Sequence, residues 1–311
     1  LITNCDDAYG DRVGTIDIEV DRHSETGPSV RVPDTAGGLS SDDLERCFGV
    51  LGGRTSGFDQ GERVRGLFGR GAKDTATFGA TTFETIHDGI LGRFELTRTG
   101  HWTNDEPRLA TSDDRRRIGY ESEDNGLVAT IHLSKYTHTL PNRTRMLDQL
   151  RAHVQLREIS SRRVIRFADD ANGRRRTDIV VWEQPAGTVV ADTTIEIPRY
   201  SATAALKLWK LDSPSDGRVN SYSRNGIVVR GMHANFCNTM FGQSGLEIAS
   251  IAGELCCPRI DELVRDYDKT QGTDPDNPIR LLRRDRDGLV AEHPFYADLE
   301  RAVLEVLLPV L

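Results

Sequence analysis

Residues 66–79 read Gly66-Leu-Phe-Gly-Arg-Gly-Ala-Lys-Asp-Thr-Ala-Thr-Phe-Gly79, and the rest of the chain is organised around this stretch. Its glycines Gly66, Gly69 and Gly71 lie three and then two residues apart, and Lys73 follows. Glycines at this density let backbone N–H groups approach a ligand, because no Cβ is in the way. A helix that begins after the run would point its N-terminus at an anion. Taken alone, the stretch fits either a phosphate-binding loop or a plain connector.

The composition is that of a globular protein. The chain has 311 residues, enough for two domains or for one large domain with an appendage. Hydrophobic residues make up 37% and charged residues 28%, which argues against disorder. No apolar run approaches the roughly 18–20 residues of a membrane span, so we expect no membrane partner. The net charge of −8 gives no general field that would favour nucleic acid.

Cysteine usage indicates a reducing compartment. The cysteines are Cys5, Cys47, Cys237, Cys256 and Cys257. Their number is odd and none of them forms a Cys-x-x-Cys pair, which favours a cytoplasmic protein without disulfides. The chain begins at Leu1 with no signal peptide before it. We therefore expect a fragment, cut at its start.

Two further motifs precede the glycine run. Asn4-Cys-Asp-Asp-Ala8 falls near the end of an expected helix over residues 1–9. Alternating apolar and polar residues predict a hairpin from strands at 15–20 and 29–32. Asp34-Thr-Ala-Gly-Gly38 then leaves this hairpin as a tight turn. A serine with acidic residues after it predicts a helix start near residue 40.

Each motif suits one part of a nucleotide site. The side-chain oxygen of Asn4 can bind a hard cation such as Mg²⁺, which prefers oxygen ligands. The carboxylate of Asp34, fixed at a buried turn, can accept a hydrogen bond from an exocyclic amine such as that of adenine. Gly37 and Gly38 let a base approach the backbone. The glycine run offers N–H groups to phosphates, and Lys73 adds positive charge.

In order and spacing, the three motifs resemble those of the GHKL ATPase superfamily, named for gyrase, the large heat-shock chaperone, histidine kinase and MutL. The residues that match the motifs Asn-x-x-Asp-Ala, Asp-x-Gly-x-Gly and Gly-x-x-Gly-x-Gly are, in chain order, Asn4, Asp7, Ala8, Asp34, Gly38, Gly66, Gly69 and Gly71. A lysine in the position of Lys73 is similar to the MORC and topoisomerase VI B branches. The resemblance covers about residues 1–135.

The resemblance implies an α+β fold. Residues 1–158 would form the ATP-binding domain, a two-layer α/β sandwich of the Bergerat type with a mixed sheet and helices on one face. Residues 159–269 would form an α/β transducer-like domain, and residues 270–311 a linker with C-terminal helices. Such proteins bind ATP and Mg²⁺, with Asn4 as the implied Mg²⁺ ligand. They hydrolyse ATP slowly, and hydrolysis is coupled to lid closure and dimerisation.

This chain departs from the family pattern at several points. Ala36 stands where the second motif has its first glycine, and Leu127 occupies the position of a threonine that usually lies near the base. The family's general base is a glutamate four residues before the motif asparagine, which is upstream of Leu1. Transducer domains send a lysine or arginine to the γ-phosphate. Lys207 and Lys210 are the candidates here, although an exposed stripe on an amphipathic strand is the favoured explanation for either residue.

Several biochemical roles remain open within this resemblance. A chaperone-like or MORC-like ATPase that dimerises on nucleotide binding is the first hypothesis. The second is an ATPase subunit of a DNA-processing system of the MutL or topoisomerase VI B type. The third is a binding module that uses ATP as a switch without turnover. The partner would be a second copy together with a protein client or DNA.

The remaining patterns predict further elements. Strands are expected at residues 80–86, 92–97, 127–133, 164–167, 178–182, 188–197, 203–209, 219–223 and 227–230. Helices are expected at residues 143–159, 279–284 and 296–308, and residues 49–65 are expected to form a mobile lid. Asp6 is expected to face solvent. His233 and Cys237, four residues apart, fit either a helical metal pair or ordinary packing.

Overall fold

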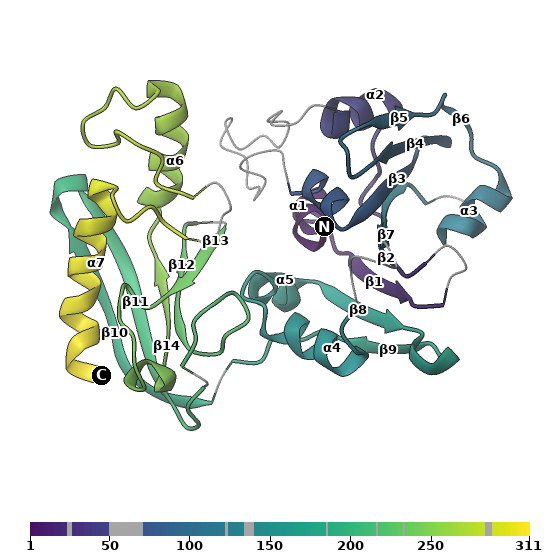
Figure 1. Cartoon of the computed structure of the whole chain (residues 1–311). Coiled ribbons are helices and arrows are strands. Elements are labelled where there is room, and N and C mark those ends of the chain that lie inside the picture. Colours follow the sequence, from purple (N-terminus) through teal and green to yellow (C-terminus); the bar gives the residue numbers. More distant parts are fainter. Residues whose placement is uncertain are drawn as a thin grey trace. The chain divides into compact units, whose positions relative to one another are not determined.

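A computed structural model describes residues 1–23, 27–49, 71–121, 124–133, 140–184, 186–215, 217–232, 234–283 and 288–311. The chain divides into two compact units (Figure 1). The first comprises Leu1–Arg151 and Leu156–Trp182, and the second comprises Ala152–Gln155 and Glu183–Leu311. Both contain mixed sheets and helices, which makes the chain α+β, as expected.

The first unit is built on a mixed sheet. Among the described residues its strands lie in the order β5 (Trp102–Asn104), β4 (Ile90–Leu96), β3 (Gly79–His87), β7 (Gly126–Leu133), β2 (Ser29–Asp34), β1 (Thr15–Asp21), β8 (Val164–Asp169) and β9 (Arg176–Ile179), with β6 (Arg108–Leu109) paired to β4. The β1–β8 pair is parallel, and the other pairs are antiparallel.

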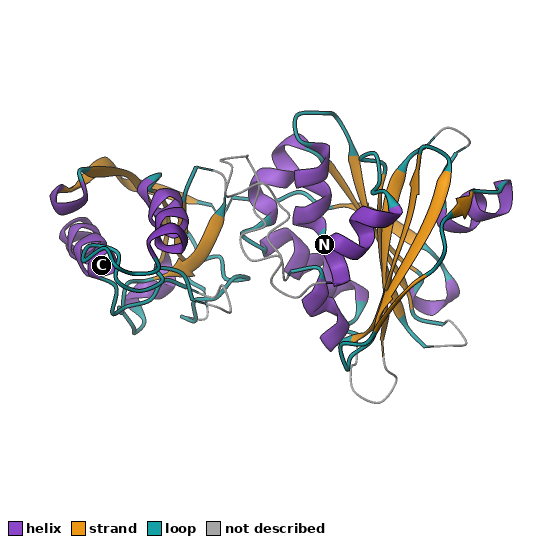
Figure 2. Ribbon diagram, turned by 90° about the horizontal axis from the view of Figure 1, so that it is seen from above, coloured by secondary structure: helices purple, strands orange, loops and turns teal. Residues whose placement is uncertain are grey.

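Most helices of this unit cover one face of the sheet. They are α1 (Ile2–Tyr9), α2 (Ser41–Leu44), which continues as a π-helical turn at Glu45–Gly49, α4 (Arg143–Ala152) and α5 (Leu156–Arg162). Alternation along β1 directs Ile16 and Ile18 into a core with Leu147 of α4 and Ile159 of α5. Figure 2 shows helices gathered along one side of these strands.

One helix differs from the expected one-sided arrangement. α3 (Ser112–Ile118) covers a corner of the opposite sheet face, where Ile118 packs with Ile86 of β3 and Val128 of β7. The residues that alternate with these, Phe83 and Ala129, belong to the cluster on the other face. The sheet is therefore covered fully on one face and partly on the other.

The second unit contains a five-stranded sheet. Its strands lie in the order β10 (Gly187–Ile197), β11 (Ala202–Leu211), β14 (Ile251–Cys256), β12 (Gly226–Arg230) and β13 (Asn235–Thr239). β12 and β14 are parallel, and the remaining pairs are antiparallel. Its α-helices are α6 (Arg259–Thr270) and α7 (Pro294–Leu307). None of the helices in the described part of the chain combines the length and the apolar character of a membrane span.

The boundary between the units differs from the expected one at residue 158. β8 pairs in parallel with β1, so residues 164–169 complete the first sheet instead of starting the second. The expected helix at 143–159 is two helices, α4 and α5, because residues 153–155 leave the helical path. Residues 152–155 belong to the second unit, in which Asn235 Nδ2 donates to the Val154 carbonyl at 2.8 Å.

Two further local expectations were wrong, and one of the two readings for Cys237 is excluded. Residues 219–223 form turns and not a strand, and β12 pairs instead with β13 and β14. Residues 279–283 are not helical, and Leu282 makes an isolated bridge with Leu289. Cys237 lies on strand β13, so it has no helical spacing to His233, which is outside the described residues.

Candidate functional site

Asp34 is a buried carboxylate at the end of β2. The residue is only 6% exposed. Its Oδ1 accepts a hydrogen bond from the Ala36 N–H at 3.0 Å, and Tyr120 Oη donates to its main-chain oxygen at 2.7 Å. Burial raises the pKa of the Asp34 carboxyl above its usual value, although the Ala36 N–H and the Cys5 thiol bond to it and act in the opposite direction.

The contact with Cys5 joins the first two sequence motifs. Cys5 lies on α1 next to Asn4, is 5% exposed, and shares a side-chain hydrogen bond with Asp34. Burial, followed by the nearby Asp34 charge, raises the pKa of the Cys5 thiol well above its usual value. The thiol therefore stays protonated at neutral pH and serves as a donor to the carboxylate.

Side chains near the end of α1 hold the turn that follows Asp34. Tyr9 Oη accepts the Thr35 N–H at 2.9 Å and lies 3.1 Å from Thr35 Oγ1. Arg12 Nη2 donates to the carbonyl oxygen of Ala36 at 2.7 Å. These hydrogen bonds pair backbone N–H and C=O groups of the turn, which the regular pattern of a strand or helix would pair elsewhere.

Side chains of β3 hold the other end of the same turn. His87 Nδ1 lies 2.9 Å from the carbonyl oxygen of Gly37, so the ring donates from this nitrogen. Thr85 Oγ1 accepts the Leu39 N–H at 2.8 Å. The turn is thus held from α1 on one side and from β3 on the other, which fixes the position of Asp34.

The two glycines of the turn have different roles. At Gly38 (φ +69°) a Cβ would lie 2.6 Å from the Ile86 carbonyl oxygen and 2.8 Å from that of Gly126. Gly38 therefore allows the turn to pack against β3 and β7. At Gly37 (φ +106°) the nearest atom to a Cβ would be at 3.8 Å. That atom is Arg12 Nη1, at an ordinary van der Waals distance, so Gly37 is less crowded than Gly38.

Asn4 and Asp7 lie on α1 as expected. Asn4 is exposed and Asp7 is half-buried. The described residues include no group of three or more His, Cys, Asp or Glu side chains that could hold a metal ion. Mg²⁺ commonly takes one or two protein oxygens and completes its shell with waters and substrate phosphates. A single amide oxygen from Asn4 fits that kind of coordination.

Asp6, expected to face solvent, is buried. It is 1% exposed and pairs with both Arg162 and Arg163, the latter through Arg163 Nε at 2.8 Å. Arg163 also donates to the carbonyls of Gly10 and Arg12 after α1. Sequence reasoning missed this cluster because its partners are more than 150 residues apart.

Only the end of the glycine run is described. Gly66 and Gly69 lie outside the described residues, which begin again at Gly71. The run is followed by a 3₁₀ helix at Lys73–Thr77 instead of an α-helix. Lys73 is 4% exposed, and burial lowers the pKa of its ammonium group. In this structure the lysine lies in the interior.

Described residues in or beside the three motifs border one apolar cluster. Its buried members are Leu44, Ala76, Phe83, Phe94, Leu96 and Ala129. Leu1 from the start of α1, Leu39 after the turn and Ala72 at the end of the glycine run all pack against it. Leu127 packs there too, and it pairs with Asp34 in the β2–β7 register. The motifs are therefore brought to the same face of the first sheet.

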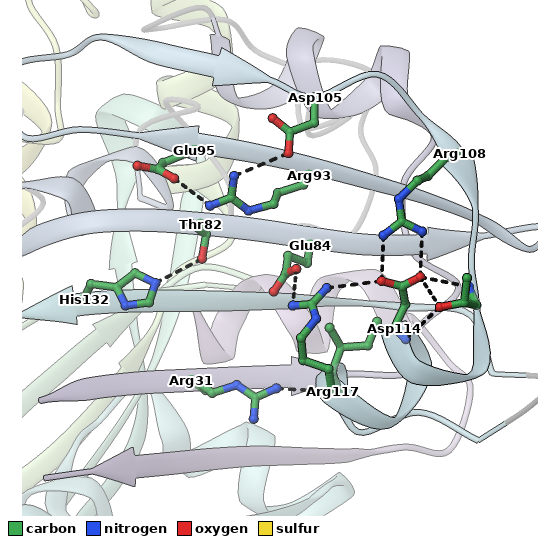
Figure 3. Close-up of polar contacts among 12 residues, drawn as sticks. Arg31, Thr82, Glu84, Arg93, Glu95, Asp105, Arg108, Asp114, Arg117 and His132 are labelled. Carbon is green, nitrogen blue, oxygen red and sulfur yellow. Dashed lines mark hydrogen bonds and ion pairs between the residues drawn. The ribbon is translucent and has the colours of Figure 1, made fainter. Parts of the chain in front are cut away.

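The opposite face of this sheet carries charges that are already paired (Figure 3). Arg117 Nη1 lies 2.6 Å from Glu84 Oε1, and Arg93 Nη2 lies 2.7 Å from Glu95 Oε2. Opposite charges at these distances satisfy one another. We therefore place the candidate site on the α1 face.

The candidate γ-phosphate contacts lie on β11 of the second unit. Lys207 Nζ forms an ion pair with Asp192 Oδ2 at 2.8 Å, across the β10–β11 ladder. Lys210 is exposed near the end of the strand. To contact a γ-phosphate, Lys207 would first have to break its ion pair with Asp192.

No protein-family model matches this chain, and no curated protein matches it significantly. The residues that sequence reasoning missed here are Cys5, Tyr9, Arg12, Thr85, His87 and Tyr120. Cys5 could have been found from the sequence, because it lies inside the first motif. The others could not, because their partners in the turn are distant in sequence.

Proposed function

We propose that this chain is an ATPase of the GHKL type, which binds Mg-ATP on the α1 face of its first sheet. The observation that carries the proposal is the Asp34 carboxylate. It is buried, its pKa is raised by burial, and side chains from α1, from the residues just after it and from β3 fix the turn around it. Burying an ionisable group costs stability, so a fold that retains one at a rigid turn commonly uses it for binding.

The proposed binding mode assigns one task to each motif. Asp34 accepts a hydrogen bond from the exocyclic amine of adenine, which packs beside Gly37, the less crowded glycine of the turn. Asn4 supplies an oxygen to the Mg²⁺ that accompanies the phosphates, with Asp7 close by on the same helix. Gly71 and Lys73 at the end of the glycine run contribute to the phosphate site, and Lys73, which is buried in this structure, would have to turn toward the phosphates. Gly66, Gly69 and nearly all of the lid expected at residues 49–65 lie outside the described residues.

The proposal extends to the fold and to turnover. The first unit would be a Bergerat-type domain and the second a transducer-like domain, with a dimer formed when nucleotide binds. Lys210 is the first γ-phosphate contact to test, because Lys207 is already paired with Asp192. A cytoplasmic location agrees with the five cysteines, which are not joined in disulfides.

Calorimetric titration of Mg-ATP into the wild-type chain and into Asp34→Asn tests the central assignment. A hydrogen bond to a charged group contributes about 1.5–3 kcal/mol. The variant should therefore bind ATP about 10- to 100-fold more weakly. Asp113→Asn is the matched control, because the Asp113 side chain is 87% exposed and forms a surface ion pair with Arg116. Equal affinities of the wild type and Asp34→Asn would refute the adenine assignment.

A measurement of phosphate release then distinguishes an ATPase that turns over from a module that only binds ATP. A version extended upstream of Leu1 should release phosphate slowly and dimerise in the presence of Mg-ATP. Tight binding without release would identify an ATP-operated switch instead. Nucleotide-dependent DNA binding with a steep salt dependence would favour the DNA-processing role over the chaperone-like or MORC-like role.

A further inference from the structure

We propose that Arg12 is a positioning residue that ties the base-binding turn to α1 and so determines how well the site holds the base of the nucleotide. This inference rests on the proposed function and concerns the same site. Arg12 lies outside the three sequence motifs: it follows the first of them and is three residues after the end of α1. It was not among the expected site residues.

The contacts of Arg12 join two separate stretches of backbone. Its Nη2 donates to the carbonyl oxygen of Ala8 in the last turn of α1 at 2.7 Å, and to that of Ala36 in the turn at 2.7 Å. Its Nε lies 3.3 Å from the carbonyl oxygen of Tyr9. The Nη1 atom lies 3.8 Å from the position that a Cβ of Gly37 would take. One planar guanidinium therefore contacts both sides of the junction.

An arginine suits this position because carbonyl oxygens from two segments of backbone face it and accept hydrogen bonds. The last four carbonyl groups of a helix have no partner within the helix, and the Ala8 carbonyl is one of them. Arginine carries several N–H donors in a rigid plane, so it can serve carbonyls from two segments at once. A lysine ammonium on a flexible stem would hold this geometry less well.

The hydrogen bonds of Arg12 join the two parts of the proposed nucleotide site. Asn4 on α1 faces the cation and phosphates, whereas Asp34 and Gly37 in the turn face the base. Arg12 is bonded to both segments through their main-chain carbonyl oxygens, and its positive charge also acts to lower the pKa of the Asp34 carboxyl. Loosening the turn should therefore weaken binding of the base much more than binding of the phosphates.

The test compares three probes: Mg-ATP, adenosine without phosphates, and Mg-tripolyphosphate without a base. Affinities are measured calorimetrically for the wild type, Arg12→Ala, Arg12→Lys and the control Arg116→Ala. Arg116 is 77% exposed and pairs with Asp113 on the other sheet face. For Arg12→Ala we expect about tenfold weaker binding of Mg-ATP and adenosine, as loss of two hydrogen bonds implies, with Mg-tripolyphosphate unchanged. Arg12→Lys should be intermediate, and the control unchanged.

The outcomes distinguish this inference from the proposed function. Equal weakening of adenosine and Mg-tripolyphosphate would show a merely structural role and overturn the inference. Unchanged adenosine binding in Arg12→Ala would also overturn it, while Mg-ATP binding by the wild type still supported the proposed function. A wild type that bound no probe would overturn both. If Arg12→Ala fails to fold, the selective weakening of adenosine binding in Arg12→Lys decides.

Discussion

At the scale of single residues, Asp34 shows how binding and stability oppose each other in this site. Its carboxylate is buried, and burial raises its pKa. A raised pKa means that ionisation is harder in the folded state than in the unfolded state. At neutral pH the ionised group therefore destabilises the fold. As the pH falls through the folded-state pKa, the carboxyl takes up a proton and this destabilisation disappears.

We therefore predict that Asp34→Asn is at least as stable as the wild type at pH 7, although it loses nucleotide affinity. The neutral amide removes the ionisation penalty and keeps a similar shape. Thermal unfolding at pH 7 and pH 4 measures this. The advantage of the variant should be present at pH 7 and should shrink at pH 4. A variant clearly less stable than the wild type at pH 7 would count against the assigned sign of the pKa shift.

Gly37 and Gly38 should differ in how well they tolerate an alanine side chain. Gly38→Ala would bring a Cβ to within 2.8 Å of two carbonyl oxygens, whereas the nearest atom to a Cβ at Gly37 lies at 3.8 Å. Both positions have positive φ, which costs about 1–2 kcal/mol for alanine. We predict that Gly38→Ala lowers the free energy of unfolding by at least 1 kcal/mol more than Gly37→Ala, roughly the additional cost of overpacking. Urea denaturation of both variants compares them directly.

At the scale of elements, α1 is attached to the rest of the first unit by a buried ion cluster. Asp6 is 1% exposed and faces two arginines, of which Arg163 is itself buried. The alternation and spacing within residues 1–9 could not reveal this, because Arg162 ends α5 and Arg163 follows it, far along the chain. The cluster fixes the helix that carries Asn4 and Cys5.

Removing the charge of Asp6 should therefore be costly. We predict that Asp6→Asn lowers the free energy of unfolding of the first unit by about 3 kcal/mol, because it leaves two guanidinium groups near one neutral amide. The exposed Asp113→Asn should change it by less than about 0.5 kcal/mol. Chemical denaturation of both variants gives the comparison. Similar small effects in the two would mean that the Asp6 cluster is solvated in solution.

At the scale of the whole molecule, the two units have different sources of pH dependence. In the second unit His293 caps α7 by accepting the Phe295 N–H at Nδ1 (3.0 Å), and its Nε2 donates to Asn277 Oδ1 (3.0 Å). Burial, together with the nearby Arg199 charge, lowers the pKa of His293 to about 4. The unfolded chain takes up this proton near pH 6.5, but the folded unit does not. Stability is therefore lost as the pH falls from about 6.5 to about 4.

We predict that the second unit loses about 2 kcal/mol of stability between pH 7 and pH 5 through His293. Amide hydrogen exchange in α7, compared with the first-unit sheet, measures this unit by unit. His293→Asn keeps a capping oxygen but cannot titrate, so its pH dependence should be smaller. An equal pH dependence in the variant would contradict the assignment.

Much of the local structure could be predicted from the sequence because it depends on neighbouring residues. Alternation predicted the β1–β2 hairpin, and a capping serine predicted the start of α2, where Ser40 Oγ accepts the Asp43 N–H. Turn residues located the bend after Asp34. The helix expected at 143–159 was wrong because residues 152–155 belong to the second unit, and no pattern within a helix reports such tertiary contacts.

The sequence by itself determined the order of the three motifs, the short-range elements that carry them and the residue types suited to a nucleotide. Only the tertiary structure decided that β8 joins β1 in parallel, that Asp6 is buried against two arginines, and that Arg12, Thr85 and His87 hold the turn around Asp34. The physical reason is separation along the chain. Periodicity and capping act within about a dozen residues, whereas a parallel strand pair, a buried ion cluster or a side chain bonded to a distant carbonyl depends on segments that only folding brings together.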